Sequence, residues 1–100
     1  MKNHRNCRVI AYSNEKTGGF DLYLNIHGRQ EYVSSHRKNG LIFLLLKDGI
    51  ALSDLKRIRI MDLKRRFNIY SRTTLYKLEN SLVHLLDVID EYIECIRCAA

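Results

Sequence analysis

Proline and tryptophan are absent from this sequence of 100 residues, and there are only five glycines and three cysteines. Proline and glycine interrupt helices more strongly than any other residues, so we expect long helices and few irregular loops. Because 46% of the residues are apolar, the chain does not have the polar composition of a disordered protein. The sequence therefore predicts one small folded domain over residues 1–100.

Long hydrophobic runs are also missing. The longest uninterrupted apolar run covers residues 41–46, whereas a helix needs about 20 such residues to span a bilayer. The first residues do not lead into a hydrophobic signal segment. We therefore expect a cytoplasmic protein that has no membrane partner.

The cysteines are too few and too scattered for a disulfide framework, so three reduced thiols are expected. Cys95 and Cys98 form a Cys-x-x-Cys pair, but at the C-terminal end of an expected helix, where the helix dipole opposes a thiolate. A structural zinc site needs four ligands, and one cysteine pair supplies half of them. The sequence predicts neither a metal nor a cofactor.

Charge of one sign dominates most of the chain. Residues 1–78 hold 16 basic and 6 acidic residues, a formal charge of +10, whereas residues 79–100 have a formal charge of −4. A basic surface attracts nucleic acid through counterion release, and it also attracts acidic proteins. The expected partner is therefore nucleic acid or an acidic protein or nucleoprotein surface.

The first third of the chain has the pattern of strands. Residues 20–27 alternate between apolar and polar, which is typical of a strand with one buried face. Residues 8–13 and 31–35 are β-prone, and turn residues occupy 14–19, where Gly18 and Gly19 can take positive φ, and 28–30. The sequence predicts a three-stranded antiparallel β-meander in residues 1–36.

A helical period follows in residues 37–100. A helix is expected over residues 41–47, ended by Asp48 and Gly49, and Ser53 is the expected N-cap of the next helix. The apolar residues before Ile58 and those from Ile60 onward fall on different faces of a continuous helix, which indicates either a kink or two short helices. Residues 57–60 also alternate between basic and apolar, as a strand does. The predicted fold is α+β, with the meander followed by about three helices.

The last helix has the clearest pattern. Apolar residues recur at alternating spacings of three and four, and Ser71 or Thr73 can cap the start of a helix of about six turns. These apolar residues form a stripe along one side of the helix. The stripe could pack against the rest of the domain or against the same helix of a second copy in a homodimer. The homodimer would form through Leu75, Leu78, Leu82, Leu85 and Ile89.

Signatures of catalysis are missing. The sequence has no phosphate-binding loop and no histidine pair at the spacing of a helical zinc site. His27 and His36, with Arg37, leave a metal-independent ribonuclease open as an alternative. The main prediction is a protein without enzymatic activity.

Residues 62–82 read DLKRRFNIYSRTTLYKLENSL. This segment resembles the bacterial helix-turn-helix, with Leu63, Phe67, Ile69, Leu75 and Leu78 in the core positions. Asn68 stands where glycine is usual, and asparagine tolerates the left-handed backbone that such a turn needs. The segment departs from the pattern at Tyr70, which is one residue more than the usual turn, and at Lys64, which replaces a small residue. The resemblance implies that the second helix of the segment faces nucleic acid.

The sequence thus predicts a non-enzymatic nucleic-acid-binding protein, and a small regulator in particular. The outward residues Arg72, Thr73, Thr74 and Lys77 are expected to contact bases. Phosphate contacts are expected from Lys56, Arg57, Arg59, Lys64, Arg65 and Arg66. The alternative is a protein-binding module or inhibitor that acts through its basic surface, such as a phage-encoded blocker of a host nuclease.

Overall fold

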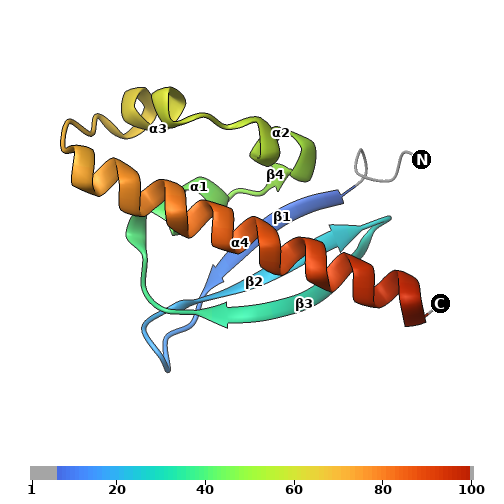
Figure 1. Ribbon diagram of the computed structural model, residues 1–100. Helices are drawn as coiled ribbons and strands as arrows, with labels where there is room; N and C mark the ends of the chain where they lie inside the picture. The colour runs from blue at the N-terminus through green and yellow to red at the C-terminus, as the bar shows by residue number, and fades with distance from the viewer. Residues whose placement is uncertain (1–6, 100) are drawn as a thin grey trace. The chain divides into compact units, whose positions relative to one another are not determined.

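The computed structural model describes the backbone of residues 7–99 and the side chains of residues 7–96 (Figure 1). The chain divides into two compact units, Met1–Ile58 and Arg59–Ala100, which are called the first and the second unit below. The first unit contains the sheet and two short helices, and the second unit contains a short and a long helix. The fold is α+β, as the sequence predicts, with the strands first and the long helix last.

The sheet of the first unit is an antiparallel meander with one added strand. Strands β1 (Cys7–Ser13), β2 (Phe20–Ile26) and β3 (Arg29–His36) follow one another, and β4 (Ile50–Ala51) pairs with the other edge of β1. The strand order is β3-β2-β1-β4. The meander of residues 7–36 confirms the predicted three-stranded antiparallel sheet. Strand β4 was not predicted, because two residues are too few to show an alternating apolar pattern.

Residues with a positive φ angle form the turns of the meander. Between β1 and β2, Gly18 has φ +78° as expected, whereas Gly19 has an ordinary φ. Between β2 and β3, His27 (φ 51°) and Gly28 (φ 81°) are both left-handed, as a tight two-residue hairpin turn requires. The turn is therefore one residue earlier than the sequence indicated, and β3 begins already at Arg29.

One face of the sheet forms the core of the first unit. Alternate side chains of β1 and β2 are buried on this face, and helices α1 (Gly40–Leu46) and α2 (Leu52–Arg57) both contact β1. The buried side chains are Cys7, Val9, Ala11, Phe20, Leu22, Leu24, Ile42, Leu45, Leu46, Leu52 and Leu55.

The opposite face of the sheet carries a row of three tyrosines, Tyr12, Tyr23 and Tyr32, one from each long strand. Their rings meet edge to face, with centroids 5.3 Å apart for Tyr12 and Tyr23 and 5.5 Å apart for Tyr23 and Tyr32. The Tyr12 hydroxyl accepts a hydrogen bond from the Gln30 side chain at 2.9 Å. Cross-strand aromatic pairs of this kind stabilise a sheet and hold the rings in fixed positions.

The caps of the short helices differ partly from expectation. Asn39 caps α1, because its side-chain oxygen accepts from the Ile42 amide at 3.2 Å. The prediction of Ser53 as an N-cap is wrong: α2 begins at Leu52, directly after β4, and Ala51 is its N-cap. Pairing of Ile50 and Ala51 with β1 fixes the start of the helix before the chain reaches Ser53.

The slip in apolar phase marks a break between two helices. Ile58 and Arg59 are extended between α2 and α3 (Ile60–Phe67), so residues 57–60 form neither a strand nor a kinked helix. In the second unit α3 contacts α4 (Arg72–Ala99), a helix of 28 residues. The Ser71 side chain caps α4 by accepting from the Thr74 amide at 3.3 Å. Within residues 7–99, no helix combines the length and apolar character that a bilayer crossing requires.

Substitution of Gly19 tests the packing of the first turn against β3. A Cβ atom on Gly19 would lie 2.0 Å from the His36 carbonyl oxygen, whereas a Cβ atom on Gly40 would meet nothing within 4 Å. We expect Gly19→Ala to lower the free energy of unfolding by about 2 kcal/mol, as an overpacking change does. The matched control Gly40→Ala should be neutral or stabilising, because alanine favours a helix. Urea unfolding measures both, and equal stabilities would contradict the described contact.

Candidate nucleic-acid interface

A left-handed turn at Asn68 ends α3 and begins the segment that leads into α4. Asn68 has φ 57° and ψ 45°, and the amides of Asn68 and Ile69 both donate to the carbonyl oxygen of Lys64. At the other end of α3, the Asp62 carboxylate accepts from the Arg59 amide at 3.0 Å. Both ends of this helix of eight residues are therefore capped by its own side chains and backbone.

The buried side of α3 and of the turn matches the expected core positions. Leu63 and Ile69 are buried, and Phe67 is half-buried. On α4, Leu75 and Leu78 are buried. Lys64 is exposed, so the large side chain at this position is not enclosed between helices.

The exposed face of α3 is formed by Met61, Lys64, Arg65 and the C-cap residue Asn68. Lys64, Arg65 and Asn68 follow Met61 by three, four and seven residues, a spacing that places all four on one side of the helix. Arg59 and Arg66 are also exposed, but their spacing directs them to another side of α3. Among the four basic residues expected to bind phosphate here, α3 therefore brings Lys64 and Arg65 together.

A shallow hollow of about 290 Å³ lies over this face. Its lining consists of Met61, Lys64, Arg65, Asn68 and Tyr70, all within the second unit. Tyr70 is 78% exposed and Met61 is 58% exposed. The Tyr70 hydroxyl donates a hydrogen bond to the Asn68 side-chain oxygen at 2.9 Å, so the aromatic side chain has a fixed partner although it faces solvent.

The charge of this region is strongly positive. Residues 59–77 contain six basic residues and one acid, Asp62, a formal charge of +5. Among the side chains that the structure describes, no carboxylate forms an ion pair with Arg59, Lys64, Arg65, Arg66, Arg72 or Lys77. These cations therefore remain available to an anionic partner.

The start of α4 exposes all four residues predicted to contact bases, Arg72, Thr73, Thr74 and Lys77. They do not share one face, because Arg72 and Thr74 are two residues apart and so lie about 200° apart around the helix axis. Thr73 and Lys77 are on the same side, opposite the buried leucines, and Tyr76, which is 64% exposed, lies beside them. The outward face of α4 is therefore formed by Thr73, Tyr76 and Lys77.

Three residues of the site were missed by sequence reasoning. Met61 and Tyr70 line the hollow, and Asn68, predicted only as a turn residue, lines it too. The spacing of Met61 with Lys64, Arg65 and Asn68 is a signal that could have found the face of α3. Lys56 and Arg57 are exposed on α2 and belong to the first unit, so the second unit does not bring them to the hollow.

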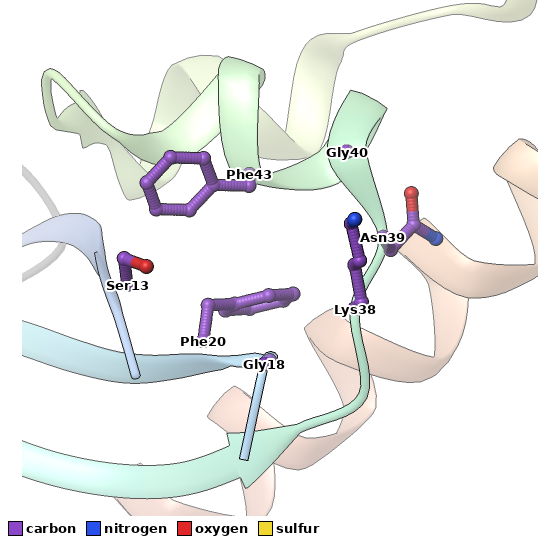
Figure 2. A pocket seen from close by; sticks show the side chains of 8 residues that line it. Ser13, Gly18, Phe20, Lys38, Asn39, Gly40 and Phe43 are labelled. Atoms are coloured by element: carbon purple, nitrogen blue, oxygen red, sulfur yellow. The ribbon is translucent and has the colours of Figure 1, made fainter. Parts of the chain in front are cut away.

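Another hollow, of about 120 Å³, lies in the first unit (Figure 2). The rings of Phe20 and Phe43, whose centroids are 6.4 Å apart, and the Lys38 side chain line it, together with the turn around Gly18. Its lining includes one ionisable side chain. It therefore offers much less to an anionic polymer than the basic face of α3.

The two histidines of the ribonuclease alternative lie at opposite ends of a hairpin. His27 is in the turn between β2 and β3, whereas His36 pairs with Phe20 at the far end of β3. The length of the strands separates them by about 20 Å. His36 instead stacks on Phe20 and hydrogen-bonds to the Ser34 hydroxyl at 2.6 Å. The two imidazoles cannot act on the same phosphodiester.

The cysteine pair and the helical stripe were also singled out by the sequence. Cys95 is exposed near the C-terminal end of α4, and the side chain of Cys98 lies outside the described residues. The described part of the chain contains no group of three metal-ligating side chains. The stripe proposed for a homodimer, Leu75, Leu78, Leu82, Leu85 and Ile89, is buried, and the homodimer stays a prediction.

No protein family, curated protein or solved structure matches the chain in comparisons of sequence and fold. We therefore infer the function from the geometry and charge of the second unit.

Substitution of Asn68 tests the left-handed turn. Alanine disfavours this backbone conformation and glycine accepts it, so Asn68→Ala should lower the free energy of unfolding by about 1 kcal/mol relative to Asn68→Gly. Asn80→Ala, at an exposed position inside α4, is the matched control and should be neutral or stabilising. Urea unfolding monitored by circular dichroism measures the stability of the three variants. An Asn68→Ala protein as stable as Asn68→Gly would contradict the left-handed backbone conformation at Asn68.

The buried thiol of Cys7 makes stability depend on pH. Burial raises the pKa of Cys7, and nearby Lys56 opposes part of this effect. The native thiol therefore stays protonated at a pH where the unfolded chain ionises, so stability falls as pH rises above the unfolded pKa of about 8.5. The stability difference between the protein and Cys7→Ala should shrink over that range in urea unfolding. A constant difference would contradict the burial of the thiol.

Proposed function

We propose that the protein is a non-enzymatic nucleic-acid-binding protein, and a small regulator in particular, that acts through α3, the turn at Asn68 and the start of α4. The observation that carries this proposal is the group of exposed cations in residues 59–77 that have no carboxylate partner among the described residues. A phosphate backbone supplies a regular row of anions that such a group neutralises, with release of counterions.

The phosphate contacts come from the basic side chains of α3. Lys64 and Arg65 act together, because they share one exposed face, and Arg59 and Arg66 reach phosphates on another side of the helix. Lys56 and Arg57 supply separate contacts from the first unit. The region lacks acids except Asp62, whose carboxylate caps α3, so little like-charge repulsion weakens the approach of a polyanion.

The base contacts come from the start of α4. Thr73 and Lys77 share the outward face of the helix, and Arg72 and Thr74 flank it. Lysine and arginine donate to guanine, and threonine offers both a hydroxyl and a methyl group. The acidic residues of α4 all lie beyond its first turn, so the basic end of the helix is the end that approaches nucleic acid.

Charge removal at Lys64 and Arg65 tests the proposal. Fluorescence-anisotropy titrations with duplex DNA, single-stranded DNA and RNA should show binding at low salt that weakens as salt rises. The double variant Lys64→Gln, Arg65→Gln should lower the slope of log affinity against log salt by about 2, since each phosphate contact contributes about 0.9 for duplex DNA. Lys16→Gln, an exposed lysine in the first turn of the meander, is the matched control. Absence of binding to all three nucleic acids would remove the proposal.

The alternative, a protein-binding module or inhibitor, was expected to act through the basic surface, but the one observation that favours it is a different surface, the row of Tyr12, Tyr23 and Tyr32 on the sheet. Tyr12 and Tyr32 are exposed, and fixed aromatic side chains are enriched at protein interfaces. A partner that co-purifies through nuclease treatment and high salt, and is lost in Tyr32→Ser but not in Lys64→Gln, would support this function instead.

A further inference from the structure

The hollow of α3 is lined by two kinds of side chain. Tyr70 and Met61 contribute exposed apolar surface, and Lys64 and Arg65 contribute positive charge. Its volume of about 290 Å³ is just below the range of small-molecule sites, which begins at about 300 Å³. The hollow therefore suits one flat group rather than an extended ligand.

The Tyr70 ring is held in place before any ligand arrives. Its hydroxyl donates to Asn68 at 2.9 Å, and the backbone of Asn68 is itself fixed by the C-cap of α3. A tyrosine side chain has few rotatable bonds, so little conformational entropy is lost when a ligand stacks on it. Met61 is flexible and polarizable, which suits contact with the edge or face of a second ring.

We propose that this hollow binds a single unstacked nucleobase against Tyr70 and Met61, with the adjoining phosphate neutralised by Lys64 and Arg65. This inference rests on the proposed nucleic-acid function and narrows its substrate to strands with unpaired nucleotides. A duplex hides the faces of its bases by stacking, whereas a single strand offers both the ring and the phosphate. An acidic peptide would satisfy the two cations but would leave Tyr70 and Met61 without a partner.

An abasic strand separates the base contact from the phosphate contact. The probes are a fluorescent oligothymidylate and a strand of the same length in which every base is absent, titrated at low salt. We expect the protein to bind oligothymidylate roughly tenfold more tightly, because stacking of bases on aromatic side chains contributes about that much per base. An unlabelled duplex and poly-glutamate serve as competitors, and both should compete less well than oligothymidylate.

Variants of Tyr70 locate the base contact. Tyr70→Leu should remove the preference for oligothymidylate and leave the affinity for the abasic strand unchanged. Tyr70→Phe keeps the ring but loses the hydroxyl that donates to Asn68, so it should keep most of the preference. Tyr32→Leu is the matched control, since Tyr32 is also exposed and hydrogen-bonded through its hydroxyl but lies in the first unit, outside both the hollow and the proposed base-contacting face of α4. Circular dichroism checks that each variant is folded. Tyr70 is 78% exposed, so neither Tyr70 variant removes a buried side chain.

The outcomes distinguish the two proposals. Equal affinity for the two strands, equal losses in Tyr70→Leu and Tyr32→Leu, or competition by the duplex or poly-glutamate as strong as that of oligothymidylate, would overturn the base-binding hollow while the broader function stands. Absence of binding to oligothymidylate, the abasic strand and the duplex would overturn both.

Discussion

The left-handed backbone of Asn68 is the constraint on which the functional geometry of the second unit depends. It ends α3 at Phe67, because the amide of Ile69 donates to the carbonyl oxygen of Lys64 instead of making the next helical bond to Arg65. Because the helix ends there, Tyr70 emerges beside the exposed face of α3, and Ser71 is free to cap α4. One backbone conformation thus sets the helix end, the position of the aromatic ring and the start of the long helix.

The distribution of charge gives the second unit two different ends. Residues 59–77 carry a formal charge of +5 and residues 79–100 carry −4. Both ends belong to one unit, and the long helix α4 runs from the basic region into the acidic one. A polyanion is therefore attracted to α3 and the first turns of α4 and repelled by the later turns, so the charges favour one end of the helix for binding.

Much of the fold followed from local patterns. The alternation in residues 20–27 predicted β2. The phase slip between Ile58 and Ile60 indicated either a kink or two short helices, and the structure has two short helices there. Asn68 was expected in the turn and Ser71 or Thr73 as the cap of the last helix, and the structure has Asn68 at the end of α3 and Ser71 as the cap of α4. The sequence did not reveal β4, because Ile50 and Ala51 become a strand only through pairing with β1, 41 or more residues earlier along the chain. The error at Ser53 has the same origin, since that pairing determines where α2 begins.

The sequence predicted the basic residues of the candidate site but not the hollow that lies among them. Lysine and arginine clusters are visible in a sequence, so the basic residues of α3 and α4 were found. Met61 and Tyr70 were missed, because an exposed apolar side chain has no signature until the structure shows that nothing covers it. The separation of Arg72 and Thr74 around the helix axis follows from the helical period alone, so it could have been predicted from the sequence once both residues were assigned to a helix.

Mapping by NMR determines whether nucleic acid binds α3, the turn at Asn68 and the start of α4. We expect the largest chemical-shift changes in residues 60–77, with Lys64, Arg65 and Tyr70 among them, when the isotope-labelled protein is titrated with a short single-stranded oligonucleotide. Changes concentrated on the tyrosine row of β1, β2 and β3, or no changes at all, would contradict this prediction.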